Sequence, residues 1–144
     1  MATIQSNYEG ILRTKATHLQ SKTVIFTDAP TDNNGKGEAF SPTDLVAAAL
    51  GNCMMTVMGI FASKNSISLE NSAENAEKIS YETTKIMSTD LPRRIIEIKI
   101  DFKFPKTFNI NAENQQKLIN AAHTCPVALS LHPEIKQNVS FLFE

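Results

Sequence analysis

The sequence has no tryptophan, only two cysteines, and no surplus of charge of either sign. Its formal net charge at pH 7 is −1, and its lysines and arginines form no block, which argues against nucleic acid or an anionic membrane surface as the main partner. Internal repeats and low-complexity tracts are also absent. The 144 residues, 42% of them hydrophobic, suffice for one core, so we expect a single domain over residues 1–144.

The N-terminus lacks a positively charged segment leading into an apolar one, so we expect no signal peptide and a cytoplasmic protein. Free thiols are the default in a reducing compartment. Cys53 and Cys125, 72 positions apart, are therefore expected to be catalytic, metal-binding or merely buried, rather than a permanent disulfide. Taken singly, each cysteine is adequately explained as a small buried hydrophobe.

One long apolar stretch organises the chain, and it predicts a helix over residues 41–62. Ser41 is suited to cap the helix, Pro42 to its first position, and Asp44 to an acidic capping box. From Leu45 to Ala62 no polar face is left for water, so the helix must be covered all round. One small sheet cannot do this alone, so a homodimer is expected.

This apolar run also reaches the lower limit for a membrane span, about 18 residues. No basic cluster or aromatic belt flanks the run, and Asn52 lies at its middle. A core helix is the better interpretation, and we expect no membrane partner.

The segments around this helix read mainly as strands. Residues 3–8 and 11–17 predict a hairpin that turns at Glu9-Gly10, with Arg13 on its second strand. Residues 96–104 alternate isoleucine and phenylalanine with charged residues, which predicts an antiparallel sheet with helices on one side. We also expect strands at 22–27, 66–69 and within 76–88, a loop at 28–40, a helix at 109–123, and a last strand with Val139, Phe141 and Phe143.

Cys125 precedes Pro126, which suggests that the cysteine caps a short helix. A thiol there would face free N–H groups and the positive end of the helix dipole, which favours a thiolate. Cys53, inside its helix, gains almost nothing from this effect. By position alone, Cys125 is expected to be the more acidic thiol.

The stretch Ser41-Pro-Thr-Asp-Leu-Val-Ala-Ala-Ala-Leu-Gly-Asn-Cys53, followed by Cys125-Pro-Val, resembles the OsmC/Ohr family of osmotically inducible and organic-hydroperoxide-resistance proteins, especially its broad OsmC-like branch. The likeness covers nearly the whole chain, including Thr27-Asp-Ala-Pro30. It implies an α+β fold in which antiparallel sheets pack around a long buried central helix, and an intertwined homodimer with two thiol sites at its interface. It also implies a thiol peroxidase for organic hydroperoxides, an external dithiol reductant of the lipoyl type, and no bound cofactor.

By motif, Cys53 matches the family's peroxidatic cysteine and Cys125 its resolving cysteine, the reverse of the order that the helix dipole suggests. Arg13 is the closest match to the family arginine that activates the thiol, with Arg93 and Arg94 as alternatives.

The chain departs from the hydroperoxide-resistance branch after the helix-start proline, where it has Thr43 in place of a glutamate. Asp44 matches the acidic position of the wider branch, so it either anchors the arginine or only caps the helix.

Residue chemistry is consistent with this resemblance, because a thiolate that attacks a peroxide oxygen becomes a sulfenic acid, which condenses with a second thiol. An apolar surround from Met54, Met55, Met58 and Phe61 would favour bulky hydroperoxides, although methionines on a core helix more often serve packing. Two alternatives stay open. One is a metal site of Cys53, Cys125, His123 and His132, which lacks the usual C-x-x-C or H-x-x-x-H spacing; the other is a non-catalytic dimer that binds a small apolar ligand between its subunits, which Thr43 favours.

Overall fold

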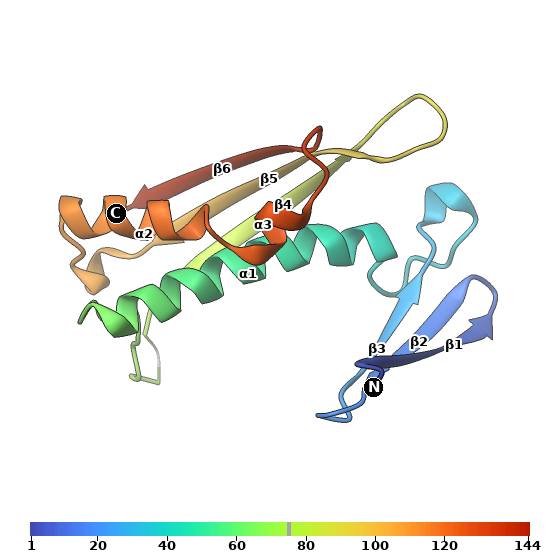
Figure 1. Cartoon of the computed structure of the whole chain (residues 1–144), viewed down its shortest axis with the longest axis horizontal. Coiled ribbons are helices and arrows are strands. Elements are labelled where there is room, and N and C mark those ends of the chain that lie inside the picture. Colours follow the sequence, from blue (N-terminus) through green and yellow to red (C-terminus); the bar gives the residue numbers. More distant parts are fainter. Residues whose placement is uncertain (75) are drawn as a thin grey trace. The chain divides into compact units, whose positions relative to one another are not determined.

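The computed structural model describes residues 1–74 and 76–144, which form two compact units, Met1–Val46 (unit 1) and Ala47–Glu144 (unit 2). The prediction of a single domain stays a prediction. In chain order (Figure 1) the elements are β1 (Ile4–Gly10), β2 (Arg13–His18), β3 (Val24–Asp28), η1 (Thr31–Asn33), α1 (Pro42–Lys64), β4 (Ser80–Met87), β5 (Ile95–Phe104), η2 (Lys106–Phe108), α2 (Ala112–Ala122), α3 (Pro126–Ser130) and β6 (Lys136–Phe143).

Unit 1 contains a three-stranded antiparallel sheet in the order β1-β2-β3. The predicted hairpin forms, but its turn lies at Ile11 and Leu12, not at Glu9-Gly10. A bulge between Tyr8 and Gly10 shifts the register and moves the turn along the chain. The Leu12 N–H donates to the Tyr8 hydroxyl at 3.2 Å, which supports this unusual turn of two residues with positive φ.

The side chains of unit 1 bury almost no apolar surface. Its only buried residues are polar, namely Thr27, Asp28 and Ser41. Large apolar side chains are exposed on the strands and loops instead: Ile4, Tyr8, Ile11, Leu12, Val24, Ile25, Phe26 and Phe40.

The capping box predicted at the start of α1 is present. The Asp44 N–H donates to Ser41 Oγ at 3.1 Å, and the Ser41 N–H donates to Asp44 Oδ2 at 2.9 Å. Pro42 occupies the first helical position, where its missing N–H has no cost. Two of the N–H groups that a helix start leaves unpaired are thereby satisfied.

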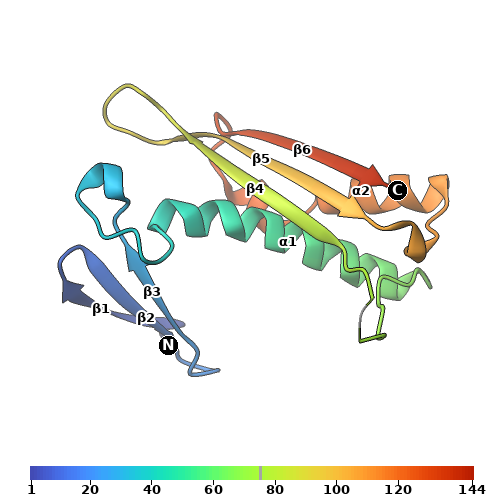
Figure 2. The ribbon, with the colours of Figure 1, turned by 180° about the vertical axis from the view of Figure 1, so that it is seen from behind.

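Unit 2 packs its helices on one face of a three-stranded sheet in the order β4-β5-β6, as the two opposite views show (Figures 1 and 2). The buried stripe of α1 faces alternate residues of β5, and Leu118 and Ala122 of α2 join the same core. The other members are Ala47, Leu50, Met54, Met58, Ala62, Ile95, Ile98, Ile100, Phe102, Phe104 and Cys125.

Gly51 lets α1 approach the sheet closely. A Cβ at this position would lie 3.1 Å from Thr83 Oγ1 and 3.3 Å from the ring of Tyr81, which is tighter than ordinary side-chain contact. Tyr81 also donates from its hydroxyl to Asn52 Oδ1 at 2.8 Å, so the helix is fixed to β4 one residue before Cys53.

The sheet of unit 2 differs from the prediction in three respects. It is mixed rather than antiparallel, because β6 runs parallel to β5 after the crossover through α2 and α3. Residues 66–69 form no strand. Ile96 is exposed and Ile95 is buried in its place, because a register shift opposite Ile86 and Met87 reverses the alternation there.

The long helix is not covered all round by its own chain. α1 is long and apolar enough to cross a membrane by composition, but one stripe of it packs against the sheet, as in a core helix. Val46 and Ile60 on its other sides are exposed, by 36% and 50%.

Candidate functional site

Two free thiols from distant parts of the chain meet in unit 2. Cys53 lies on α1 and is partly exposed, whereas Cys125 lies directly before α3 and is fully buried. The two thiols lie close enough for Cys53 to raise the pKa of Cys125. The fold therefore brings together the two cysteines that the sequence singles out.

Cys125 caps α3, as its position before Pro126 predicts. Its Sγ accepts the N–H of Ala128 at 3.2 Å, and its backbone is extended as at other helix caps. The Cys125 N–H in turn donates to the Ala122 carbonyl, so the short connection from the end of α2 fixes the backbone that carries the thiol.

Burial raises the pKa of the Cys125 thiol, and the neighbouring Cys53 thiol raises it further. The N–H groups of Ala128 and Val127 act in the opposite direction, as expected at a helix start. The prediction that this position makes Cys125 acidic is therefore wrong, since the loss of water around the sulfur outweighs the helix N–H groups. Cys125 is held as a neutral thiol.

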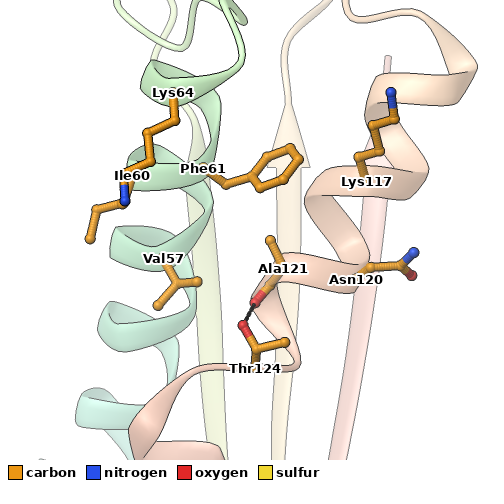
Figure 3. A pocket seen from close by; sticks show the side chains of 8 residues that line it. All are labelled: Val57, Ile60, Phe61, Lys64, Lys117, Asn120, Ala121 and Thr124. Atoms are coloured by element: carbon orange, nitrogen blue, oxygen red, sulfur yellow. Dashed lines mark hydrogen bonds between the residues drawn. The ribbon is translucent and has the colours of Figure 1, made fainter.

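A groove of about 510 Å³ lies between the C-terminal half of α1 and the end of α2 (Figure 3). Phe61 points from α1 across toward α2, and Ala121 faces it from the other side. The remaining lining residues are Val57, Ile60, Lys64, Lys117, Asn120 and Thr124.

The residues that line this groove are close to the two cysteines in the sequence. Val57 is one helical turn after Cys53, and Phe61 follows one turn later, so the three share one side of α1. On the other wall Thr124 directly precedes Cys125. The volume is in the range usual for small-molecule sites, and its walls are mainly apolar with polar groups toward the rim.

The four residues expected to form an apolar surround divide into different environments. Met54 and Met58 are fully buried in the core, so they serve packing. Phe61 lines the groove, and Met55 faces a separate hollow beside Leu69 and Phe108.

Arg13, the expected activating residue, lies in unit 1 and is held by two carboxylates. Its Nε and Nη2 donate to Asp28 Oδ1 and Oδ2 at 2.7 and 2.8 Å, and Nη2 also donates to Glu38 Oε2 at 2.9 Å. The hydrogen bond to Asp28 is the main cause that raises the pKa of Arg13, and the Arg13 guanidinium in turn lowers the pKa of Asp28 below its usual range.

Sequence reasoning missed Asp28 and Glu38. A signal for Asp28 was present, because it directly follows the predicted strand 22–27 within Thr27-Asp-Ala-Pro30, but only the strand register puts it opposite Arg13. Glu38 follows a glycine-rich segment that reads as a plain loop, and no pattern in the chain links it to Arg13.

The other expected charged residues have structural contacts. Asp44 belongs to the capping box of α1, and its role as an arginine anchor stays a prediction. Arg93 donates from Nε to the Ser88 carbonyl, and Arg94 forms an exposed ion pair with Glu134 at 2.8 Å.

Within residues 1–74 and 76–144, no three histidine, cysteine or carboxylate side chains are grouped as a metal site would require. His132 uses its Nδ1 to accept the Glu134 N–H, and His123 packs edge-on against Phe141. No observation therefore favours the metal alternative.

Comparison with known proteins gives one family. Residues 35–140 match the family model named OsmC-like protein. A search of curated proteins finds no match.

Solved structures match over nearly the whole chain. One is a protein from Psychrobacter arcticus 273-4, provisionally named an osmotic stress induced and detoxification response protein, with 45% identity and a TM-score of 0.87 over 99% of this chain and 96% of that one. Two others share the fold at low identity. They are the organic hydroperoxide resistance protein OsmC of Legionella pneumophila (17% identity, TM-score 0.72, 98% and 97% covered) and OhrB of Bacillus subtilis (15%, 0.66, 99% and 98%).

Proposed function

The chain belongs to the OsmC-like protein family, and from this premise we propose that it is a thiol-dependent peroxidase that reduces organic hydroperoxides. The observation that carries the proposal is that the fold brings Cys53 and Cys125, the only two cysteines of the chain, into the same core region. Two similar folds are those of organic hydroperoxide resistance proteins, which agrees with this chemistry.

The reaction needs two steps and both thiols. A Cys53 thiolate attacks the terminal peroxide oxygen, the O–O bond breaks, and the alkoxide leaves and takes a proton to become an alcohol. Cys125 then attacks the sulfur of the Cys53 sulfenic acid, the thiol proton leaves with the hydroxyl as water, and a disulfide forms. An external dithiol, which the family resemblance suggests is of the lipoyl type, restores both thiols by exchange.

The raised pKa of Cys125 supports this division of roles. A fully buried neutral thiol is a poor first nucleophile, because the thiolate is the reactive form. Cys53 is partly exposed and lies one helical turn before Val57, which lines the groove, so a peroxide can reach it more readily. We assign the apolar part of the substrate to that groove and the peroxide oxygens to its end near Cys53.

Arg13 is proposed to stabilise the Cys53 thiolate, since a guanidinium stays charged even when its surroundings are partly dry. Asp44 contributes by capping the helix that carries Cys53, or by anchoring the arginine. The active form is proposed to be a cytoplasmic homodimer, in which a second copy covers the apolar surface that one chain leaves exposed on α1.

Turnover of cumene hydroperoxide with a dithiol tests the proposal. The native protein should consume peroxide continuously, Cys53→Ser should reduce the rate to background, and Cys125→Ser should stop after one turnover with a trapped sulfenic acid. Oxidised native protein should lose the mass of two hydrogens. If Cys53→Ser instead still forms a sulfenic acid while Cys125→Ser leaves Cys53 unmodified, the two roles are exchanged.

The activating role of Arg13 has its own test. In a Cys125→Ser background, Arg13→Ala should shift the pH midpoint of Cys53 alkylation upward by at least about one unit, since an opposite charge within about 4–6 Å lowers a pKa by one to three. Arg13→Lys should restore the midpoint only partly. An unchanged midpoint would leave Arg13 a structural role and point to Arg93 or Arg94.

A second function, binding of a small apolar ligand without catalysis, is favoured by two observations. The groove is a formed site with apolar walls, and Thr43 stands where the hydroperoxide-resistance branch has a glutamate. Absence of peroxide turnover, together with saturable binding of an apolar fluorescent probe that Phe61→Ala weakens, would support this alternative.

A further inference from the structure

Arg13 binds two carboxylates, although one is enough to balance its charge in a stable ion pair. Asp28 is only 1% exposed and occupies both Nε and Nη2 in a two-point contact, which fixes the guanidinium and balances its charge. Glu38 is 63% exposed and adds a single contact at Nη2. The three groups together carry a net charge of −1, so the cluster as it stands is a poor partner for a thiolate.

Two glycines in the loop before Glu38 are required by the backbone conformation of that loop. A Cβ on Gly35 would overlap the Ala29 carbonyl group, and Gly37 has φ +62° with Thr31 Cγ2 only 2.8 Å from where its Cβ would be. Both positions therefore require glycine. The Glu38 N–H donates to Asp28 Oδ2 at 3.0 Å, which holds the residue beside Arg13 even when its side chain moves.

The Glu38 carboxylate binds one specific nitrogen of the Arg13 guanidinium, Nη2. Among the described residues, the contacts of Arg13 use Nε and Nη2, and neither hydrogen of Nη1 has a partner. Asp28 takes the Nε/Nη2 edge, so the Nη1/Nη2 edge is the one left to bind a second anion at two points, and the Glu38 carboxylate blocks its Nη2 half. The other charged groups near this cluster are Lys36, which acts on Asp28, and Lys15, two residues along the same face of β2.

From these contacts we propose that Glu38 is a positioning residue that masks Arg13: its carboxylate stands in for the reacting anion on the guanidinium edge and weakens the activation of Cys53 until it is released. This inference rests on the proposed role of Arg13 toward Cys53. Asp28 is the permanent anchor in this scheme, and Glu38 is the exchangeable one, because it is exposed and attached at one point.

The test measures the pH midpoint of Cys53 alkylation in a Cys125→Ser background. Glu38→Gln removes the charge at constant shape and should lower the midpoint by about 0.2–0.7 unit, a size set by the weak interactions of exposed charges. Glu9→Gln makes the same charge change at an exposed position of β1 and should leave the midpoint unchanged. The shift from Glu38→Gln should disappear in the Arg13→Ala variant, because without the guanidinium there is nothing to mask.

The outcomes separate the two proposals. If Arg13→Ala raises the midpoint but Glu38→Gln leaves it unchanged or raises it, masking by Glu38 is wrong and the role of Arg13 stands. If Glu38→Gln lowers the midpoint equally with and without Arg13, Glu38 acts directly on the thiol and masking is again wrong. If Arg13→Ala leaves the midpoint unchanged, the activating role of Arg13 and its masking by Glu38 are both wrong.

Discussion

The two units of this chain are stabilised by different kinds of interaction. Unit 2 buries every hydrophobic residue that is buried among the described positions, whereas the buried residues of unit 1 are all polar. Unit 1 is organised by hydrogen bonds and charge, with Arg13 bound to Asp28 and Glu38, and its apolar side chains stay exposed. The difference shows that unit 2 has an apolar core of its own, whereas unit 1 has none within a single chain.

The largest effect is expected from a charge placed on the exposed apolar surface of unit 1. Ile25 is 45% exposed on β3 and lies opposite Ala16. If a second copy covers it, Ile25→Glu buries an unpaired charge and should shift the mass in sedimentation from about 32 kDa toward the 15.9 kDa of one chain. Gln5→Glu adds the same charge on an exposed residue of β1 and should stay dimeric. A native protein that sediments as a monomer at micromolar concentration would break this view of unit 1.

The next effect concerns the core of unit 2. Phe102 is 1% exposed and stacks on Phe141 with ring centroids 5.2 Å apart. Phe102→Ala should cost about 3–5 kcal/mol in free energy of unfolding, measured by denaturant at fixed protein concentration. Phe26→Ala in unit 1 removes a side chain that is 46% exposed and should cost much less. Equal losses in free energy of unfolding would mean that Phe26 is fully buried in the assembled protein. The two units would then differ in apolar burial only within a single chain.

A third effect is the pH dependence of the polar centre of unit 1. The Arg13 guanidinium lowers the pKa of Asp28 in the folded protein, so the stabilisation from this pair is fully present above the unfolded pKa of about 3.9 and is lost as the pH falls through the folded value. Asp28→Asn should therefore lower the melting temperature at pH 7, and the two curves should converge below about pH 4. Asp90→Asn, in an exposed loop, should follow the native curve throughout.

The smallest effect concerns the capping box that starts α1, the helix shared by both units. Ser41→Ala removes the hydroxyl that accepts the Asp44 N–H and should cost about 1 kcal/mol in thermal or denaturant unfolding. Ser72→Ala, at an exposed position, is the matched control and should be neutral. A neutral Ser41→Ala would show that α1 is held by its packing alone.

The helices were largely predictable from local signals, and the sheet less so. Pro42 and Pro126 mark helix starts that the structure confirms, because capping depends on residues a few positions apart. The turn at Ile11 and Leu12 and the reversal at Ile95 and Ile96 depend on the pairing register between strands. A register is decided by residues far apart in the sequence, so no local pattern reveals it.

For the candidate site, the sequence predicted the residue types: one cysteine within a helix and one before a helix, an arginine on a strand, and the motifs that place the chain in its family. The tertiary structure brings the two thiols close together, places Asp28 and Glu38 on Arg13, and raises the pKa of Cys125 by burial. The physical reason is that capping and helix dipoles act over a few residues, whereas burial and charge pairing depend on which distant segments exclude water from the same place.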